Sequence, residues 1–300
     1  DEIQNTLDKK QQVILFQNRR GYAPYIACGN CNWIPQCKNC DVSLTYHKYT
    51  NDLRCHYCGY TQAVMHSCGA CGSHELQQKG LGTERIEEDL KTMFPSANIG
   101  RMDYDTVKSK HGHNKIIEAF EDGAFDILVG TQMVTKGLDF TNVSLVGVLN
   151  ADSLLFYPDF RAMERAYQLL LQVSGRAGRR EKRGKVMIQI GNVHHVIANF
   201  ILENNYEDFY QAQLEERKQF HYPPFSRLIQ LTIKHKDIKT TIEAANKVSE
   251  YLHAKYSGWV VGPNAPIIQK INNYYLRDIL VKIPRSYKEL HRIKNDIQQA

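Results

Sequence analysis

The sequence lacks the features that mark membrane and secreted proteins. No apolar run approaches the roughly 18 residues of a membrane helix, and no signal peptide opens the chain. There is also no initiator methionine, and Asp1, Glu2 and Ile3 are typical of an internal cut. We therefore expect a cytoplasmic fragment of a longer protein, with no membrane partner.

Two motifs of nucleotide hydrolases are absent as well. The sequence has no Gly-x-x-x-x-Gly-Lys-Ser/Thr phosphate loop and no Asp-Glu-x-His magnesium motif. Because these motifs hold the phosphates and the magnesium ion, we expect this chain alone to hydrolyse no ATP. The formal net charge of +6 permits an anionic partner but does not require one.

All eight cysteines of the chain fall in four Cys-x-x-Cys pairs. The pairs are Cys28/Cys31, Cys37/Cys40, Cys55/Cys58 and Cys68/Cys71. Tetrahedral zinc takes four thiolates and two such pairs supply four, so the spacing predicts two closed, structural zinc sites. Gly29, Gly59, Gly69 and Gly72 are expected to give these turns a positive φ.

Two other interpretations of the cysteines compete with zinc. A disulfide framework needs an oxidising compartment and usually has varied spacings, and neither is indicated here. A redox dithiol would make repeated pairs redundant. His56, His66 and His74 lie near the cysteines, but eight thiolates already fill two tetrahedra, so we do not expect these histidines to be ligands.

The spacing leaves two ways in which the pairs can share the ions. Residues 41–54 suffice for a hairpin that brings the inner two pairs together, and the outer two pairs then close around them. This nested arrangement makes residues 25–75 one finger-like insertion, whose ends near Tyr25 and Leu76 lie close together. A sequential arrangement that joins neighbouring pairs is the alternative. The nested sets are Cys37/Cys40/Cys55/Cys58 and Cys28/Cys31/Cys68/Cys71.

Strand-like and helix-like segments alternate over residues 1–24 and 76–205. A helix is expected to open at Thr83, where Thr83 can cap it and Glu84 favours its positive end. Alternating strands and helices predict an α/β fold with a parallel sheet, in which ligands bind at the carboxyl ends of the strands. The strands are expected at 13–16, 98–102, 127–129, 145–149 and 186–190, and further helices around 116–120 and over 161–171.

Three segments of this region resemble motifs of a known family. Residues 130–140 and 172–180 resemble motifs V and VI of superfamily 2 helicases, and residues 80–84 resemble the motif IV region. With residues 18–24 ahead of a four-pair cysteine insertion, they make the chain similar to the PriA family of bacterial primosomal DNA helicases. The resemblance covers most of the chain and implies a second RecA-like helicase lobe that carries the two-zinc insertion.

The resemblance implies catalytic roles for three residues. Arg176 and Arg179 match arginines that act on the γ-phosphate of ATP, and Gln172 matches a position that orders the attacking water. Arginine suits this role because its guanidinium group is planar and always charged, and it can donate two parallel hydrogen bonds to phosphate oxygens. The alternative is that these arginines only coat a turn, against which the intervening Gly175 and Gly178 argue, since they let the backbone approach a ligand.

Binding roles follow from the same resemblance. Gly137 and Asp139 match positions that face the nucleotide, which would be ATP with magnesium in the full-length protein, although Asp139 also suits an ordinary turn. Thr83 and Thr131 match contacts to the DNA backbone.

From residue 206 onward the pattern changes, and residues 206–300 are expected to form a separate domain. Strands at 228–234 and 259–261, a hairpin over 267–283, and helices over 240–256 and 286–299 give the order βαββα, most of a ferredoxin-like α+β unit without its last strand. The hairpin offers a basic and aromatic face that suits a DNA strand, or else protects an edge strand. That face comprises Lys270, Tyr274, Tyr275, Arg277 and Lys282.

The resemblance finally implies a function for the longer protein. It would be an ATP-dependent 3′-to-5′ DNA helicase of the bacterial cytoplasm that recognises stalled or branched forks and restarts replication by assembling the primosome. The implied partners are branched and single-stranded DNA, primosome proteins and single-stranded-DNA-binding protein. The alternative is a non-catalytic, zinc-containing scaffold that binds forks. Arg176 and Arg179 favour the enzyme, because a scaffold needs no phosphate-sensing arginines.

Overall fold

The computed structural model describes residues 1–17, 25–47, 50–79, 82–103, 107, 110–131, 140–175 and 184–300. The chain divides into two compact units. The first unit is Asp1–Ala23 with Gly80–Phe209, and the second is Pro24–Lys79 with Tyr210–Ala300. The cysteine-rich insertion thus shares a unit with the C-terminal strands, and the three-domain division of the sequence stays a prediction.

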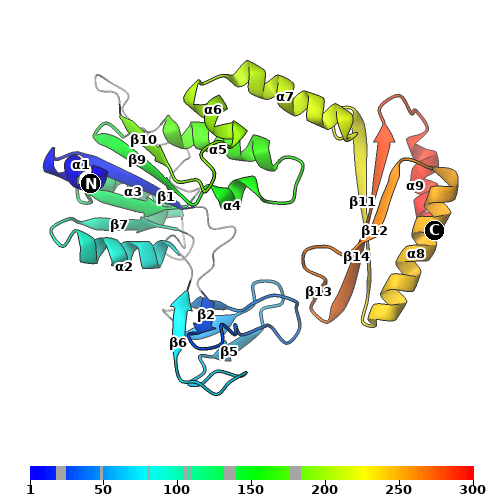
Figure 1. Ribbon diagram of the computed structural model, residues 1–300, viewed down its shortest axis with the longest axis horizontal. Coiled ribbons are helices and arrows are strands. Elements are labelled where there is room, and N and C mark those ends of the chain that lie inside the picture. The colour runs from blue at the N-terminus through cyan, green and yellow to red at the C-terminus, as the bar shows by residue number, and fades with distance from the viewer. Residues whose placement is uncertain are drawn as a thin grey trace. The chain divides into compact units, whose positions relative to one another are not determined.

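A five-stranded sheet forms the centre of the first unit (Figure 1). Its order is β10-β9-β1-β8-β7, and every neighbouring pair is parallel. This confirms the α/β fold with a parallel sheet that the alternating pattern predicted. The strands are β1 (Gln12–Gln17), β7 (Ile99–Met102), β8 (Ile127–Gly130), β9 (Val143–Leu149) and β10 (Lys185–Ile188).

Helices cover both faces of this sheet, which is why β1 and β8 are buried along their whole length. Alternate residues of β1 enter different cores: Ile14 and Phe16 pack on one face, and Val13 and Leu15 on the other. The helices of the unit are α1 (Glu2–Asp8), α2 (Thr83–Met93), α3 (Lys110–Glu121), α4 (Asp152–Leu155), α5 (Ala162–Ser174) and α6 (Val196–Leu202). The helix α1 has no counterpart in the sequence prediction.

The zinc module, which we define as residues 25–79, has two small sheets. β2 (Tyr25–Cys28) pairs antiparallel with β6 (Leu76–Lys79), so the two ends of the insertion meet as expected. A separate three-stranded sheet has the order β3-β4-β5, made by Thr45–His47, Asp52–Arg54 and Thr61–Ala63. Leu44 and Leu53 are fully buried in its core beside three of the cysteines.

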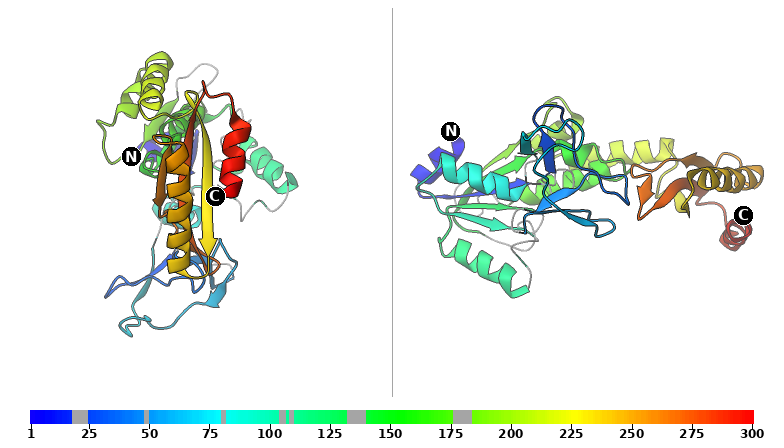
Figure 2. Two further views of the ribbon diagram at one scale, coloured as in Figure 1. Left: turned by 90° about the vertical axis from the view of Figure 1, so that its right-hand side faces the viewer. Right: turned by 90° about the horizontal axis from the view of Figure 1, so that it is seen from below.

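The C-terminal part of the second unit runs β11, α8, β12, β13, β14, α9, which is the predicted order βαββα with the two-residue β13 in addition. Its sheet runs β11-β14-β12, with the short β13 paired to β14. Helices α8 and α9 pack on the sheet face that carries Ile279, Val281 and Ile283, and α8 lies along β11 in the left view of Figure 2. The elements are β11 (Ser226–His235), α8 (Ile238–Lys255), β12 (Val260–Asn264), β13 (Lys270–Ile271), β14 (Tyr274–Pro284) and α9 (Leu290–Gln299).

One helix passes from the first unit into the second. It is α7 (Tyr206–Gln219), and its Phe209 stacks on Tyr167 of the first unit's core at a ring distance of 4.0 Å. Among the described residues, none of the helices combines the length and the apolar character that crossing a bilayer requires.

Two candidate metal centres and the carboxyl edge of the parallel sheet

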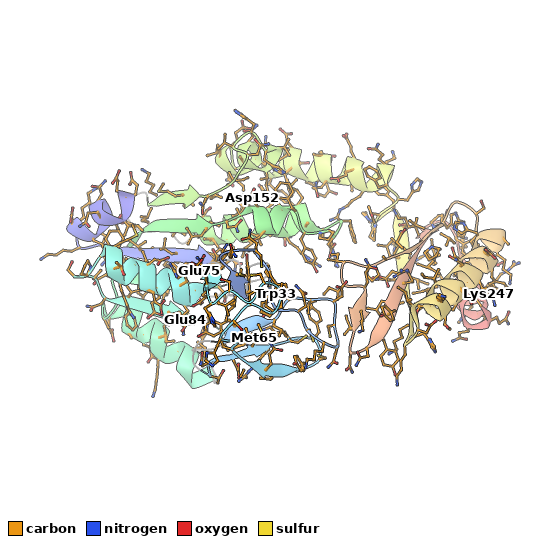
Figure 3. All side chains as sticks on the ribbon, turned by 60° about the horizontal axis from the view of Figure 1, so that its bottom comes forward. Trp33, Met65, Glu75, Glu84, Asp152 and Lys247 are labelled. Carbon is orange, nitrogen blue, oxygen red and sulfur yellow. The ribbon has the colours of Figure 1, made fainter. Side chains whose placement is uncertain are left out.

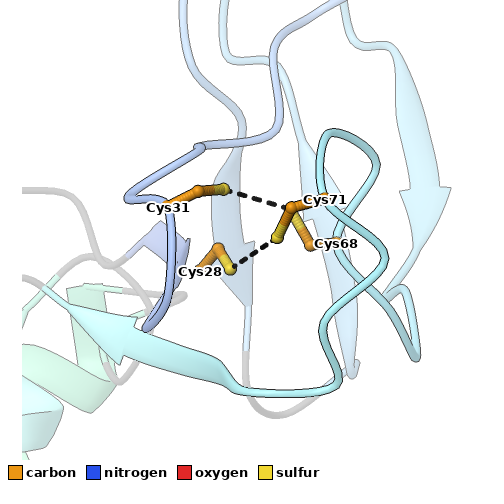
Figure 4. Close-up of side chains that lie close together, drawn as sticks. All are labelled: Cys28, Cys31, Cys68 and Cys71. Atoms are coloured by element: carbon orange, nitrogen blue, oxygen red, sulfur yellow. Dashed lines mark hydrogen bonds between the residues drawn. The ribbon is translucent and has the colours of Figure 1, made fainter.

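The first four-cysteine group, here called the first centre, comprises Cys28, Cys31, Cys68 and Cys71 (Figure 4). The Sγ atoms of Cys28 and Cys71 lie 3.6 Å apart, and so do those of Cys31 and Cys68. Because β2 pairs with β6, the turn after β2 is held against the turn that precedes β6. The outer two Cys-x-x-Cys pairs are thereby brought together.

The second centre comprises Cys37, Cys40, Cys55 and Cys58. The Sγ atoms of Cys37 and Cys58 lie 3.6 Å apart. An isolated antiparallel β-bridge between Gln36 and Ser43 closes the turn that contains Cys37 and Cys40. The two sets confirm the nested arrangement, and the sequential alternative is wrong.

The sulfur spacing shows what each group can hold. In both centres all four sulfurs lie within 4.8 Å of one another. A tetrahedron with Zn–S bonds of about 2.3 Å has edges of about 3.8 Å, close to the observed 3.6 Å. A disulfide would need about 2.05 Å, and all eight cysteines are free thiols. Both groups therefore fit a four-coordinate zinc ion, which leaves no position open for catalysis.

Backbone turns position the sulfurs. The N–H of Asn39 donates to Cys37 Sγ and that of Ala70 to Cys68 Sγ, each at 3.4 Å. Such bonds stabilise a thiolate, the form that binds zinc. The N–H of Cys31 lowers the pKa of the Cys28 thiol to about 6. Burial, in contrast, raises the pKa of Cys40 to about 12, and only a bound cation would then keep it ionised near neutral pH.

The expectation of a positive φ holds for only two of the four glycines. Gly59 and Gly72, at +75° and +73°, follow the second cysteine of their pairs. Gly29 and Gly69 stand between the cysteines without a positive φ, so that part of the prediction is wrong. They are needed for space instead. A Cβ on Gly69 would lie 2.9 Å from the ring of Trp33 (labelled in Figure 3), and one on Gly29 would lie 2.8 Å from the Gln77 amide.

The histidines near the cysteines belong to neither centre. His74 Nδ1 lies 3.0 Å from the carbonyl oxygen of His66, a contact within the module. His56 packs edge-on against the ring of His47. The expectation that sulfur alone supplies the ligands is confirmed for the described residues.

The carboxyl edge of the parallel sheet carries a polar cluster in the first unit. Thr83, the first residue of α2, is buried, and its hydroxyl donates to the buried carboxylate of Asp103, just after β7. Arg101 Nε lies 3.3 Å from a Glu87 oxygen and 3.7 Å from Asp103. The residue that caps α2 is Gly82, so the expected capping role of Thr83 is wrong. Sequence reasoning missed Asp103, although its place after a predicted strand marks it.

Two further side chains end strands at this edge. Thr131 follows β8, is buried, and its N–H lies 3.3 Å from the carbonyl of Met102. Gln17 ends β1, is 2% exposed, and its side-chain amide has no hydrogen-bond partner among the described residues. The edge thus carries polar groups inside the fold, as ligand-binding edges of parallel sheets do.

The predicted catalytic and nucleotide-binding residues are placed only in part. Gln172 lies on the exposed side of α5, two residues before the helix ends at Ser174. Arg176, Arg179, Gly137 and Asp139 lie outside the described residues. Their roles, like those of Thr83 and Thr131, stay predictions.

Three sequence families match successive parts of the chain. The PriA DNA helicase Cys-rich region domain matches residues 37–62, the helicase conserved C-terminal domain matches 78–181, and the primosomal protein N C-terminal domain matches 218–300. The replication restart protein PriA of Bacillus subtilis is 41% identical over 100% of this chain. Those of Haemophilus influenzae and Synechocystis are 39% and 40% identical over 98% and 95%.

The chain belongs to the PriA family. It spans 38% of the Bacillus subtilis PriA protein and 40% of the Haemophilus influenzae one. The match to the PriA Cys-rich region contains the whole second centre, and the first centre lies just outside it. The two centres are the zinc sites of this PriA-family chain. A solved Pyrococcus furiosus Hef helicase domain aligns with 68% of the chain and 26% of its own length, at 16% identity and a TM-score of 0.31.

Proposed function

We propose that the chain is part of an ATP-dependent 3′-to-5′ DNA helicase that restarts replication at stalled or branched forks. One observation carries the proposal: the helicase match at residues 78–181 falls on the parallel-sheet unit, in a chain that also has the PriA Cys-rich and primosomal matches. The relatives are named replication restart proteins.

In this proposal the first unit is one of two motor lobes. Arg176 and Arg179 bind the γ-phosphate as charge develops on it, and Gln172 orders the attacking water. Gly137 and Asp139 face the nucleotide. The phosphate loop and the magnesium ligands come from the other lobe, because this chain contains neither motif.

DNA contacts are proposed at two places. The first is the carboxyl edge of the sheet, where Thr83 and Thr131 lie. Because both residues are buried, their role would be to support the edge that contacts the DNA backbone. The β13–β14 hairpin supplies the second place. Lys270 lies 5.6 Å from the ring of Tyr275, and Lys234 lies 5.7 Å from that of Tyr274, so cations and stacking faces alternate as in single-strand binding surfaces.

One cation of the predicted basic face is already engaged within the protein. Lys282 Nζ donates to the carbonyl of Phe220 at 2.8 Å and lies 4.0 Å above the ring of Tyr222. Burial lowers the pKa of Lys282. The proposed DNA surface therefore centres on Lys270, Tyr274 and Tyr275 and does not extend to Lys282.

The proposed partners follow from the same reasoning. They are branched and single-stranded DNA, primosome proteins and single-stranded-DNA-binding protein, met in the bacterial cytoplasm. Two closed zinc sites supply no chemistry but stiffen a surface for forks or proteins. Zinc contributes folding free energy to small modules that lack a large core.

The motor proposal is tested in the full-length protein by Arg179→Ala. DNA-stimulated ATP hydrolysis should fall by about 10³-fold or more, as expected when an arginine that stabilises the transition state is lost. The control is Arg85→Ala, which removes an exposed arginine paired with Asp89 and should leave hydrolysis unchanged. Unchanged hydrolysis in Arg179→Ala would remove the arginine assignment. A full-length protein that binds forks without hydrolysing ATP would be the scaffold.

A further inference from the structure

A tight hairpin turn in the C-terminal strands lies against the second zinc centre. β13 and β14 are joined by Asn272 and Asn273, with φ angles of +50° and +64°. Two-residue hairpin loops of this kind need positive φ at both positions, which asparagine tolerates. Strand pairing ends at Ile271 and Tyr274, so the ladder leaves both loop N–H groups for other acceptors.

Both loop N–H groups donate to the zinc module. Asn272 donates to Cys40 Sγ at 3.2 Å, and Asn273 donates to the carbonyl of Asn39 at 2.7 Å. The bond to Cys40 is shorter than the 3.4 Å bond that Asn39 makes to Cys37 Sγ within the module. A ligand of the second centre thus receives a hydrogen bond from a residue 232 positions away.

Further contacts fix the hairpin in this place. The N–H of Asp41 donates to the carbonyl of Lys270 at 2.8 Å, so backbone bonds run in both directions. The side-chain amide of Asn273 donates to Asn39 Oδ1 at 3.2 Å. Ile271 packs against the buried core of the zinc module. The contact therefore has an apolar anchor as well as hydrogen bonds.

The physical effect on the metal centre follows from charge. Four thiolates on a divalent cation carry a net negative charge, which N–H donors stabilise. Cys40 is 3% exposed, so water cannot replace a lost donor at its sulfur. When a group that donates a hydrogen bond to a metal ligand is removed, the affinity for the metal commonly falls 10- to 100-fold.

The two centres differ in this respect. In the first centre the described backbone donors to sulfur lie close in sequence to the cysteines that they contact, such as Ala70 to Cys68 and Trp33 to Cys31. The first centre is therefore an internal control for any change in the hairpin.

We propose that the Lys270–Asn273 hairpin is the outer shell of the second zinc centre, and that the zinc ion there holds the C-terminal strands to the zinc module. Asn272 is a positioning residue that acts through Cys40. By linkage, metal binding and hairpin docking strengthen each other by the same factor. The inference concerns metal binding alone and does not depend on the helicase activity.

The test compares Asn272→Pro with Asn272→Gly in the full-length chain. Proline has no N–H and cannot adopt a φ of +50°, whereas glycine keeps both the donor and the turn.

The zinc-loaded proteins are exposed to a chelator and pulse-labelled with a thiol alkylating reagent, and peptide mass spectrometry reports the reaction of each cysteine. In Asn272→Pro the cysteines of the second centre should react about 10-fold faster or more, with the first centre unchanged. Asn272→Gly should match the parent protein. Equal rates in Asn272→Pro and parent, or equal acceleration at both centres, would overturn the proposal.

A second measurement covers the case in which Asn272→Pro does not fold. Amide hydrogen exchange of the peptide containing Asn272 and Asn273 is compared between the parent protein and Cys58→Ser, in which the second centre has lost a ligand. Exchange at these two amides should rise by about 10-fold or more, while β11 keeps its protection. Unchanged exchange would show that the hairpin stays docked without the metal, contrary to the proposal.

Discussion

The hydroxyl of Thr83 donates a hydrogen bond to the carboxylate of Asp103, and both side chains are buried. The bond joins the first turn of α2 to the residue that follows β7. It fixes the start of a helix at the carboxyl edge of the sheet. A residue predicted to touch DNA is therefore also part of the internal support of that edge.

Replacing Thr83 by valine should destabilise the protein. The substitution keeps the shape but removes a donor from a buried carboxylate, a change that costs about 1–3 kcal/mol. Urea unfolding of the first unit measures the loss. Thr92→Val is the control, because its hydroxyl bonds to the Glu88 carbonyl on the exposed side of the same helix. A loss in Thr83→Val no larger than that in Thr92→Val would contradict the prediction.

Zinc content should reveal how the cysteines share the ions. Cys28→Ser with Cys68→Ser removes two ligands of one centre, so the double variant should retain one zinc ion per chain. Cys28→Ser with Cys37→Ser damages both centres and should leave neither ion tightly bound. Metal analysis after gel filtration distinguishes the two variants. A zinc-free Cys28/Cys68 variant would favour the sequential sharing that the structure excludes.

Gly69→Ala should weaken the first centre while leaving the second intact. The added Cβ would meet the rigid indole of Trp33 at 2.9 Å, and overpacking of this kind costs about 1–3 kcal/mol. The rate of zinc loss from the first centre to a chelator is the measurement, and it should rise about 5-fold or more. Ala70→Ser, at the exposed neighbouring residue, should behave as the parent. Equal rates in all three proteins would show that the Trp33 ring yields freely.

Acid should weaken the attachment of α9 through Asp296. Hydrogen bonds from Lys255 and Tyr256 lower the pKa of Asp296, so its contribution to stability is present above the ordinary aspartate pKa and is lost as the pH falls through the lowered one. Asp296→Asn should therefore be less stable than the parent at pH 7, and the difference should disappear at strongly acidic pH.

The fluorescence of Trp259, which stacks on Tyr256 at 5.7 Å, reports unfolding of this region. A background of Trp33→Phe removes the other tryptophan of the chain. Asp237→Asn serves as a comparison, because Asp237 caps the start of α8 and is remote in sequence from α9. A gap between parent and Asp296→Asn that is independent of pH would contradict the assigned ionisation.

Much of the fold was predictable because its signals are local. The run from Val13 to Phe16 is apolar at every position, which is typical of a strand covered on both faces. The nested sharing of zinc is one of two arrangements that the spacing allows, and the length of residues 41–54 favours it because it permits a hairpin between the inner pairs. Glu84 and its neighbours indicate the start of α2, although the capping residue is Gly82 and not the predicted Thr83.

What the sequence could not predict depends on residues that are distant in the chain. The Asn272 N–H and the Cys40 sulfur are joined only once the C-terminal strands are folded, and backbone donors leave no trace in side-chain patterns. In the same way, the sequence predicts only a turn role for Gly69, because nothing local indicates that Trp33 packs upon it. Asp103 was missed because an aspartate after a strand is also an ordinary turn former.

The place of the zinc module within the first unit's chain has a kinetic consequence. β1 is the central strand, yet its partners β8 and β9 lie beyond the module in the sequence. The pairing of β2 with β6 brings the two ends of the module together. Once the module is folded, the loop that must close for β1 to pair with β8 is therefore shorter. Halving such a loop lowers the closure cost by about 0.6 kcal/mol, roughly threefold in rate. Two ions that take no part in the sheet thus shorten the loop that closes when its middle strand is enclosed, because they hold the module folded.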